Sequence, residues 1–270
     1  MLNWSIKLMR NLINFLIISL FICTPLYAIS TDSCFDTDTV VMLHMNGTDG
    51  STTFTDSSSN TKTVTANGNA QIDTAQSQFG GASGLFDGSG DYLSIPDDAD
   101  WDFGTGDFTI DLWFRSNVAD PNTDRVFSMG DVDAGQGIHI RFDDTVLDVR
   151  VQGNSFTFAF NPNQNQWYHV TLTRNGSNLR AFADGTQIGV TETNSSNITV
   201  SSSLFIGTSN NGGADGGQYI NGWVDELRVV KGTAVWTASF TSPSAEYTDC
   251  NAQQQNAPTA QGVSGNLNFY

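Results

Sequence analysis

The chain has 270 residues, of which 28 are Asp or Glu and only 11 are Lys or Arg, so its formal net charge at pH 7 is −17. Such an acidic surface repels nucleic acid and anionic membranes, because it has few cations with which to displace counterions from phosphates. It attracts cations, Ca²⁺ in particular. The composition therefore excludes nucleic acid as a partner.

The first 28 residues predict a secretory signal peptide. Lys7 and Arg10 supply its positive start, residues 12–26 form an apolar run that is too short for a comfortable membrane span, and Ala28 is a small residue before the cut. An uncleaved anchor is the alternative, but polar residues follow at once. Cleavage leaves 11 − 2 = 9 basic residues against 28 acidic ones, a net charge of −19. We expect a secreted protein, extracellular or periplasmic, without membrane insertion after cleavage.

Short β-segments separated by Gly, Asn, Asp and Ser follow along the chain, and no stretch shows a convincing helical period. In the clearest segment, Phe108, Ile110, Leu112 and Phe114 fall on one face, as in a half-buried strand. The predicted strands cover residues 40–45, 82–86, 92–95, 108–115, 125–129, 138–142, 146–151, 156–160, 167–174, 179–183, 186–190, 204–207 and 219–230.

Two turn signals join three of these strands into a meander. Asn175-Gly176 and Asp184-Gly185 tolerate the positive φ angles of tight hairpins. Many short strands without helices predict two packed antiparallel sheets, a jelly-roll β-sandwich. We predict one such domain over residues 29–250 and a flexible polar tail over residues 251–270.

The cysteines predict one disulfide. Cys23 leaves with the signal peptide, so Cys34 and Cys250 remain as an even pair in an oxidising compartment. A bridge between them would require the two ends of the domain to meet, and it would contribute about 4–5 kcal/mol in the chain-entropy model. Two free thiols are the alternative.

Several segments resemble the laminin-G-like jelly-roll family within the concanavalin A-like lectin and glucanase superfamily. The resemblance extends from about residue 38 to residue 248, in the order of the family. It lies in residues 81–93, 107–114, 166–170, 184–185 and 222–230. It implies a carbohydrate-binding, adhesive or accessory role, often with Ca²⁺ at the rim of the sandwich, and it does not specify a ligand.

Some relatives in that superfamily are glycosidases, which need two carboxylates a few ångströms apart. The glucanases carry them as Glu-x-Asp-x-x-Glu on one strand, but the only glutamates here, Glu192, Glu226 and Glu246, do not form that pattern. Asp225 and Glu226 are adjacent, so on a regular strand they would face opposite sides. We therefore predict that the chain is not an enzyme. The three histidines, which lack a metal-ligand spacing, are interpreted as structural; they are His44, His139 and His169.

Acidic loops at residues 56–60 and 97–102 offer the oxygen ligands that Ca²⁺ prefers. The family resemblance favours a structural Ca²⁺ held by Asp56 together with Asp225, because the first and last strands of the fold lie close together. The alternative is that these residues are solvated turn residues.

Sugar binding would require an exposed aromatic platform beside polar groups. Trp113 and Trp167 lie in predicted core strands, so we expect them to be buried. The long polar loop over residues 210–218 is a candidate functional loop. The candidates near loops or edges are Tyr92, Trp101, Phe156, Tyr219 and Trp236. Our first hypothesis is a secreted non-catalytic carbohydrate-binding or adhesion module, with a glycan or an extracellular protein as its ligand. A structural or protein-interaction module of a surface or virion assembly is the second hypothesis, and a glycoside hydrolase is the third.

Overall fold

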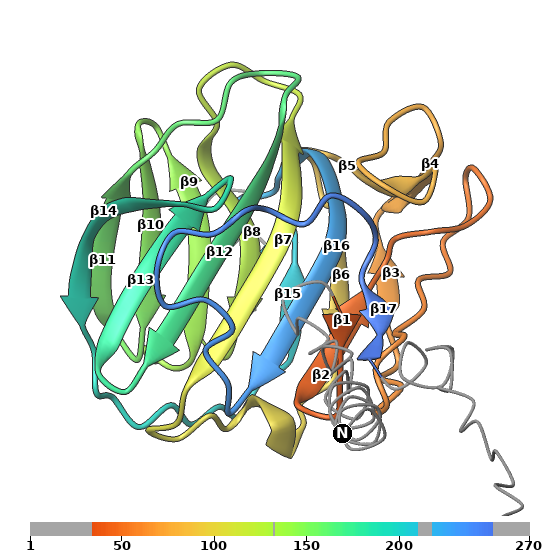
Figure 1. Cartoon of the computed structure of the whole chain (residues 1–270). Helices are drawn as coiled ribbons and strands as arrows, with labels where there is room; N and C mark the ends of the chain where they lie inside the picture. The colour runs from red at the N-terminus through yellow and green to blue at the C-terminus, as the bar shows by residue number, and fades with distance from the viewer. Residues whose placement is uncertain (1–33, 132, 210–217, 251–270) are drawn as a thin grey trace, which may run out of the picture. The chain divides into compact units, whose positions relative to one another are not determined.

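The computed structural model describes residues 34–131, 133–209 and 218–250, and it confirms the predicted antiparallel β-sandwich (Figure 1). Sheets of eight and seven strands pack against each other, and a small third sheet joins the ends of the described chain. The predicted signal peptide (1–28), the polar tail (251–270) and most of the candidate loop (210–217) lie outside the described residues. No helix in the described part is long and apolar enough to cross a membrane.

The eight-stranded sheet is built around a long strand, β16, which pairs with β7 on one side and with both β5 and β2 on the other. In spatial order its strands are β14 (Thr186–Thr193), β13 (Asn178–Ala183), β12 (Trp167–Asn175), β7 (Phe108–Ser116), β16 (Asn221–Lys231), β5 (Ser83–Asp87) and β4 (Gln71–Asp73), with β2 (Thr39–Leu43) beside β5 on the edge of β16.

The seven-stranded sheet forms the other layer, and a short 3-10 helix, η2 (Ala99–Trp101), follows its strand β6. Its strands in spatial order are β11 (Asn154–Ala159), β10 (Val146–Val151), β9 (Ile138–Asp143), β8 (Asn122–Met129), β15 (Leu204–Ile206), β6 (Tyr92–Ile95) and β3 (Thr65–Asn67). The sequence did not predict β3 and β4, because both are three-residue strands in a polar stretch without alternation.

The core lies between the two sheets, and it follows from the alternation of apolar residues along the strands. Phe114 of β7 stacks on Phe142 of β9, with ring centroids 4.9 Å apart, and so joins the layers. The predicted Asp-Gly hairpin is confirmed. Asp184 has φ 47° and Gly185 has φ 73°, as a two-residue turn of type I′ between β13 and β14 requires.

The chain after β16 crosses the outer face of the eight-stranded sheet, and we call residues 232–250 the C-terminal strap (Figure 1). Its Trp236 and Phe240 stack with ring centroids 4.0 Å apart, and Phe240 packs on Phe182 of β13. The backbone of Phe240 passes so close to Gly185 that a Cβ there would lie 2.1 Å from its carbonyl oxygen. The hairpin thus needs glycine for two reasons, its backbone conformation and the close approach of the strap.

The strap explains a difference from the sequence prediction. Strand β7 was expected to be half-buried, but both of its faces are buried, including Thr109, Asp111 and Trp113 on the side away from the core. Alternation along one strand indicates only which side chains face the core. The cover on the other face comes from distant parts of the chain: Phe79 packs on Trp113, and the strap contacts Thr109 and Asp111.

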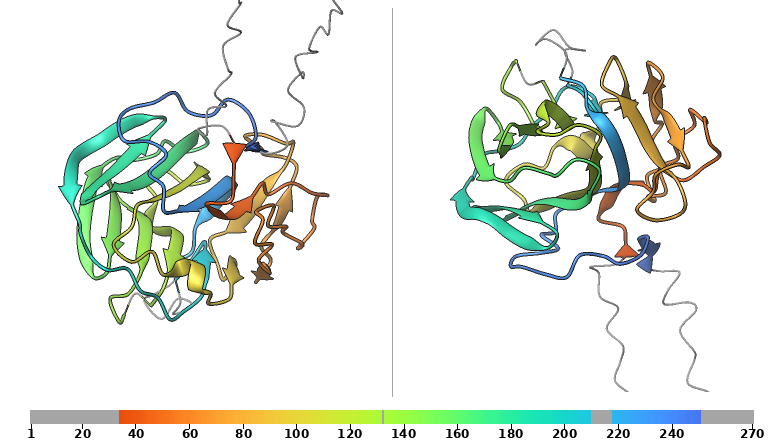
Figure 2. Two further views of the ribbon diagram at one scale, coloured as in Figure 1. Left: turned by 60° about the horizontal axis from the view of Figure 1, so that its bottom comes forward. Right: turned by 90° about the horizontal axis from the view of Figure 1, so that it is seen from above.

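The two ends of the described chain meet, as the cysteine pattern predicted. Cys34 and Cys250 form a disulfide across a sequence separation of 216 residues. The bridge lies beside a parallel pair of two-residue strands, β1 (Cys34–Phe35) and β17 (Thr248–Asp249), which Figure 2 shows side by side.

Candidate functional site

The outer face of the seven-stranded sheet carries the best candidate binding surface. The strap buries the outer side chains of β7 and β12 in the other sheet, so the central strands there are almost entirely buried. In contrast, β6 and β15 alternate between buried and partly exposed side chains. Side chains on this open face can therefore reach a ligand.

Three partly exposed aromatic rings gather on this face, and we call Tyr92, Phe205 and Tyr219 the aromatic platform. Tyr92 begins β6 and Phe205 is the middle residue of β15, and their neighbours along each strand point into the core. The rings of Tyr92 and Phe205 have centroids 6.1 Å apart. Tyr219, just before β16, stacks on Tyr92 at 6.5 Å with an interplanar angle of 28°.

Polar groups lie next to the platform and are held in place. Asn67 pairs with Tyr92 across β3 and β6, and its side-chain amide donates to Ser94 Oγ at 3.2 Å. On the other side, the buried Arg125 donates from Nε to Gln218 Oε1 at 2.8 Å, which anchors the residue before Tyr219. An aromatic surface beside fixed amide and hydroxyl groups has the composition of a site for a sugar ring.

The structure separates the predicted aromatic candidates. Trp101 is fully buried and donates from Nε1 to the Pro96 carbonyl, and Trp236 of the strap is buried against the eight-stranded sheet. Phe156 packs against the core. Only Tyr92 and Tyr219 lie together on an open face, and Phe205 joins them. The sequence missed Phe205 because an apolar strand of three residues looks like core throughout.

Beside the platform, Asp124 gives the fold a pH dependence. Its side chain is 7% exposed, Oδ2 has no hydrogen-bond partner among the described residues, and burial raises its pKa to about 6. The folded chain therefore holds a proton that the unfolded chain has released, and stability falls as the pH rises from about 4 to about 6.

We expect Asp124→Asn to remove this fall and to increase the free energy of unfolding at pH 7 by about 2–3 kcal/mol, with a much smaller effect at pH 4. Urea denaturation at both pH values measures the difference. The exposed Asp97→Asn is the control, and its pH dependence should match that of the parent chain. The same difference between Asp124→Asn and parent at both pH values would contradict the assignment.

The first residue of the predicted calcium pair, Asp56, is buried and tied to its own loop and to β2. Its Oδ1 accepts from the backbone N–H groups of Met42 and Ser58, both at 2.9 Å. Its Oδ2 accepts from the Ser58 hydroxyl at 2.8 Å and from the backbone N–H of Lys62 at 2.7 Å. These bonds engage both carboxylate oxygens.

Asp225 of β16 is also buried, with Oδ2 accepting from the backbone N–H groups of Gln78 and Phe79 at 2.8 and 3.1 Å. Burial raises the pKa of Asp225 to about 8 against the opposing effect of these bonds, so a proton competes with any cation at neutral pH. The pairing of β2 with β16 brings together the strands on which the calcium proposal rests. A Ca²⁺ ion held by Asp56 and Asp225 stays a prediction.

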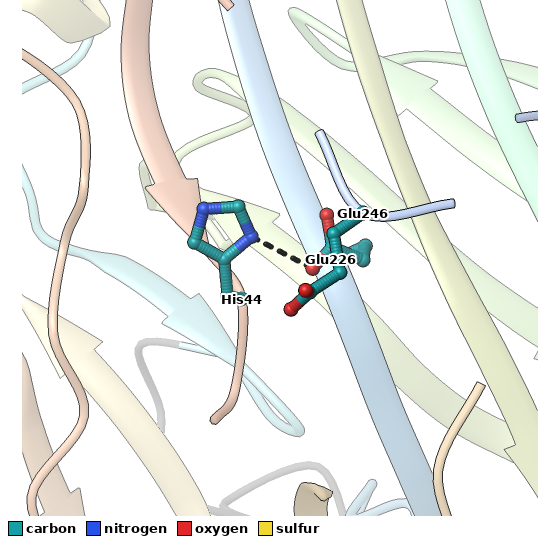
Figure 3. Close-up of side chains that lie close together, drawn as sticks. All are labelled: His44, Glu226 and Glu246. Carbon is teal, nitrogen blue, oxygen red and sulfur yellow. Dashed lines mark hydrogen bonds and ion pairs between the residues drawn. The ribbon is translucent and has the colours of Figure 1, made fainter. Parts of the chain in front are cut away.

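A different group of ionisable side chains converges at the end of β2 (Figure 3). His44 Nδ1 lies 2.7 Å from Glu226 Oε1, and one nitrogen or oxygen from each of His44, Glu226 and Glu246 falls within 4.8 Å of the others. Asn46 Nδ2 donates to Glu246 Oε1, and the backbone N–H of Tyr247 donates to Glu226 Oε2 at 2.9 Å. Sequence spacing gave no signal for this cluster, because its members come from β2, β16 and the strap.

Comparison with known proteins assigns the chain. A laminin-G-type family model described as the concanavalin A-like lectin/glucanases superfamily matches residues 87–236, which is more than half of the chain. The chain belongs to the concanavalin A-like lectin/glucanases superfamily. No curated protein sequence matches it.

Solved structures with a similar fold include toxin domains. The chain is similar to the botulinum neurotoxin type C structure described for its interaction with two ganglioside molecules, at 16% identity and a TM-score of 0.54, covering 73% of this chain and 49% of that one. It is similar to the binding domain of botulinum neurotoxin DC in complex with SialylT (15%, TM-score 0.52, 73% and 49%). It is also similar to the binding domain of Paraclostridial Mosquitocidal Protein 1 (16%, TM-score 0.51, 73% and 50%). The chain spans about half the length of these proteins, and at these identities the likeness concerns the fold alone.

The superfamily includes glucanases, which need two carboxylates beside a substrate. Glu226 is 1% exposed and hydrogen-bonded to His44 and to the backbone of Tyr247, which encloses it within the protein. Two cavities near the joined ends hold about 40 and 100 Å³, well below the roughly 300–1,000 Å³ of ordinary small-molecule sites. Neither glutamate of the cluster lines them.

One serine–histidine contact was not predicted. Ser128 Oγ lies 2.7 Å from His139 Nδ1, and His139 Nε2 lies 2.7 Å from the Gln136 carbonyl oxygen. Both side chains are buried, and burial lowers the pKa of His139 to about 4, so the ring is neutral near pH 7. The contact is closed to a substrate, and it supports the interpretation of His139 as a structural residue.

Proposed function

We propose that this superfamily member is a secreted, non-catalytic carbohydrate-binding or adhesion module that binds glycan on the aromatic platform. The observation that carries the proposal is the set of three partly exposed, mutually packed rings on the open face of the seven-stranded sheet, beside Asn67 and Ser94. Aromatic faces cover the C–H side of a sugar ring, and amide and hydroxyl groups bond its hydroxyls. The similar toxin structures, one described for its interaction with ganglioside molecules and one in complex with SialylT, add support.

A shallow platform suits a glycan chain or a terminal sugar lying on the surface. The net charge of −17 makes anionic glycans less favourable than neutral ones, since the surrounding surface repels them. We therefore propose neutral glycans as the main ligand class. The ganglioside and SialylT ligands of the similar toxin domains are anionic, so they support glycan binding by this fold and not the same class of glycan. A rim Ca²⁺ at Asp56 and Asp225 would stabilise the fold rather than contact the sugar, because both carboxylates are buried.

A glycan array probed with the purified chain, with and without Ca²⁺, tests the proposal. We expect Tyr92→Ala and Tyr219→Ala each to weaken binding of the best glycan at least tenfold, or about 1.4 kcal/mol, because each removes a stacking face. Tyr219→Phe keeps the ring and should retain most of the affinity. Trp223→Ala, on the outer side of the eight-stranded sheet, is the control for a distant partly exposed ring.

Absence of glycan binding, with the fold intact by circular dichroism, would overturn this function and favour the protein-interaction alternative. Binding that survives both tyrosine variants would move the glycan site elsewhere. Release of reducing sugar from a bound glycan would contradict the non-catalytic part of the proposal.

A further inference from the structure

We propose that His44, Glu226 and Glu246 form a binding site for a divalent transition-metal ion of the Zn²⁺ class (Figure 3). One imidazole nitrogen and two carboxylate oxygens are a donor set that suits Zn²⁺ and its neighbours, whereas Ca²⁺ prefers oxygen ligands alone. The site is separate from the aromatic platform, and neither carboxylate of the Asp56–Asp225 pair is one of its ligands.

The geometry requires only small movements to hold such an ion. Zn²⁺ lies about 2.0–2.2 Å from nitrogen and oxygen ligands, and the three donor atoms are now within 4.8 Å of one another. Small side-chain rotations would separate the His44 Nδ1 and Glu226 Oε1 atoms, now 2.7 Å apart, and bring Glu246 closer. His44 and Glu246 are only partly buried and can rotate, whereas Glu226 is fixed at 1% exposure. Three protein ligands leave a fourth position for water or for the side-chain oxygen of Asn46, which already contacts Glu246 through its amide nitrogen.

The charge of the cluster favours a cation. Within the described residues, His44 is the only ion-pair partner of Glu226, and no Lys or Arg pairs with Glu246. Two carboxyl groups facing one histidine leave an excess of negative charge, which a divalent ion would offset.

The bound ion would join three separate parts of the fold. It would link the chain just after β2, the central strand β16 and the strap. Asn46, which follows β2, and Glu246 of the strap are 200 positions apart in the sequence. An ion that binds only the folded chain would raise the melting temperature. The increase in melting temperature should be largest in a chain whose strap has lost another of its anchors.

The test is calorimetric titration of the tag-free, EDTA-treated chain with ZnCl₂ at pH 7.5, with CaCl₂ in parallel and melting curves for each. We expect one Zn²⁺ per chain, a higher melting temperature with Zn²⁺, and much weaker binding of Ca²⁺ to these residues. His44→Asn and Glu246→Gln should each weaken Zn²⁺ binding at least about tenfold. Loss of a residue that only hydrogen-bonds a metal ligand already costs about that much, and loss of the ligand itself should cost no less.

Glu192→Gln is the matched control, because Glu192 is the one glutamate outside the cluster and its replacement should leave Zn²⁺ binding unchanged. Metal-free melting curves verify that each variant folds. Absence of Zn²⁺ binding by the parent chain, or equal binding by both ligand variants, would overturn the site. If the parent chain bound Ca²⁺ as tightly as Zn²⁺, and the same variants lost that binding, the proposed class of metal would be wrong. Glycan binding should be unchanged in all three variants, so this result is independent of the proposed function.

Discussion

Replacement of Asp111 by Ala is expected to reduce the free energy of unfolding by about 3–5 kcal/mol, because it removes a buried carboxylate that an equally buried guanidinium contacts. Asp111 is fully buried under the strap and accepts from Arg228 Nε at 3.0 Å. It also accepts from the Tyr247 hydroxyl at 2.5 Å and lies 3.2 Å from His169 Nε2. The carboxylate thus joins β7, β12, β16 and the strap at one point.

The same network predicts sensitivity to acid. Burial alone would raise the pKa of Asp111, but the charge of Arg228 and the hydrogen bonds outweigh it and hold the pKa below its usual value. A carboxyl group of this kind stabilises the fold above the unfolded-state pKa of about 4, and the contribution is lost as the pH falls through the lower, folded-state pKa. Urea denaturation across pH 2–7 should show this loss in the parent chain and not in Asp111→Ala.

The matched control is Asp143→Ala, which removes a partly exposed ion pair with Arg141 in the other sheet. It should change the free energy of unfolding by at most about 1 kcal/mol. A similar small effect for Asp111→Ala would mean that the buried network contributes little and that the strap is held by its aromatic contacts alone.

Replacement of both Cys34 and Cys250 by Ala is expected to cost about 5 kcal/mol in the chain-entropy model, because the bridge closes a loop of 216 residues in the unfolded chain. Guanidinium denaturation of the double variant beside the oxidised parent measures the loss. The strap should also become the first site of limited proteolysis, since its end is then held only by β17 and side-chain contacts.

Reduction separates the bridge from the loss of the side chains. Dithiothreitol should lower the stability of the parent chain to that of the double variant and leave the variant unchanged. A parent chain that keeps its midpoint under reduction would show that the ends are held mainly by the β1–β17 pair and the Asp111 network.

The local part of the fold was predictable because it depends on neighbours in sequence. The alternation through β7 and the Asp184-Gly185 turn gave the right strands and the right meander. The disulfide followed from an even count of cysteines in an exported chain. The strap could not be predicted, because Trp236 and Phe240 sit in a polar stretch without period, and their burial depends on a face made by other strands.

The candidate sites show the same limit. Tyr92 and Tyr219 were recognised as aromatics near loops, but only the packing of β6 beside β15 shows that they share a surface with Phe205. His44 and Glu226 are 182 positions apart, and nothing in their spacing indicates that they touch. Residue types thus indicated candidate residues, whereas only the folded structure shows which of them lie close together.

The meeting of Cys34 and Cys250 determines how the domain would respond to a mechanical load. Tension applied through the flanking chain would enter at one cysteine and leave at the other along the covalent bond. The two sheets lie outside that path, so they would not be stretched. A ligand held on the open face would then stay bound under pulling forces that open a sandwich loaded through its strands.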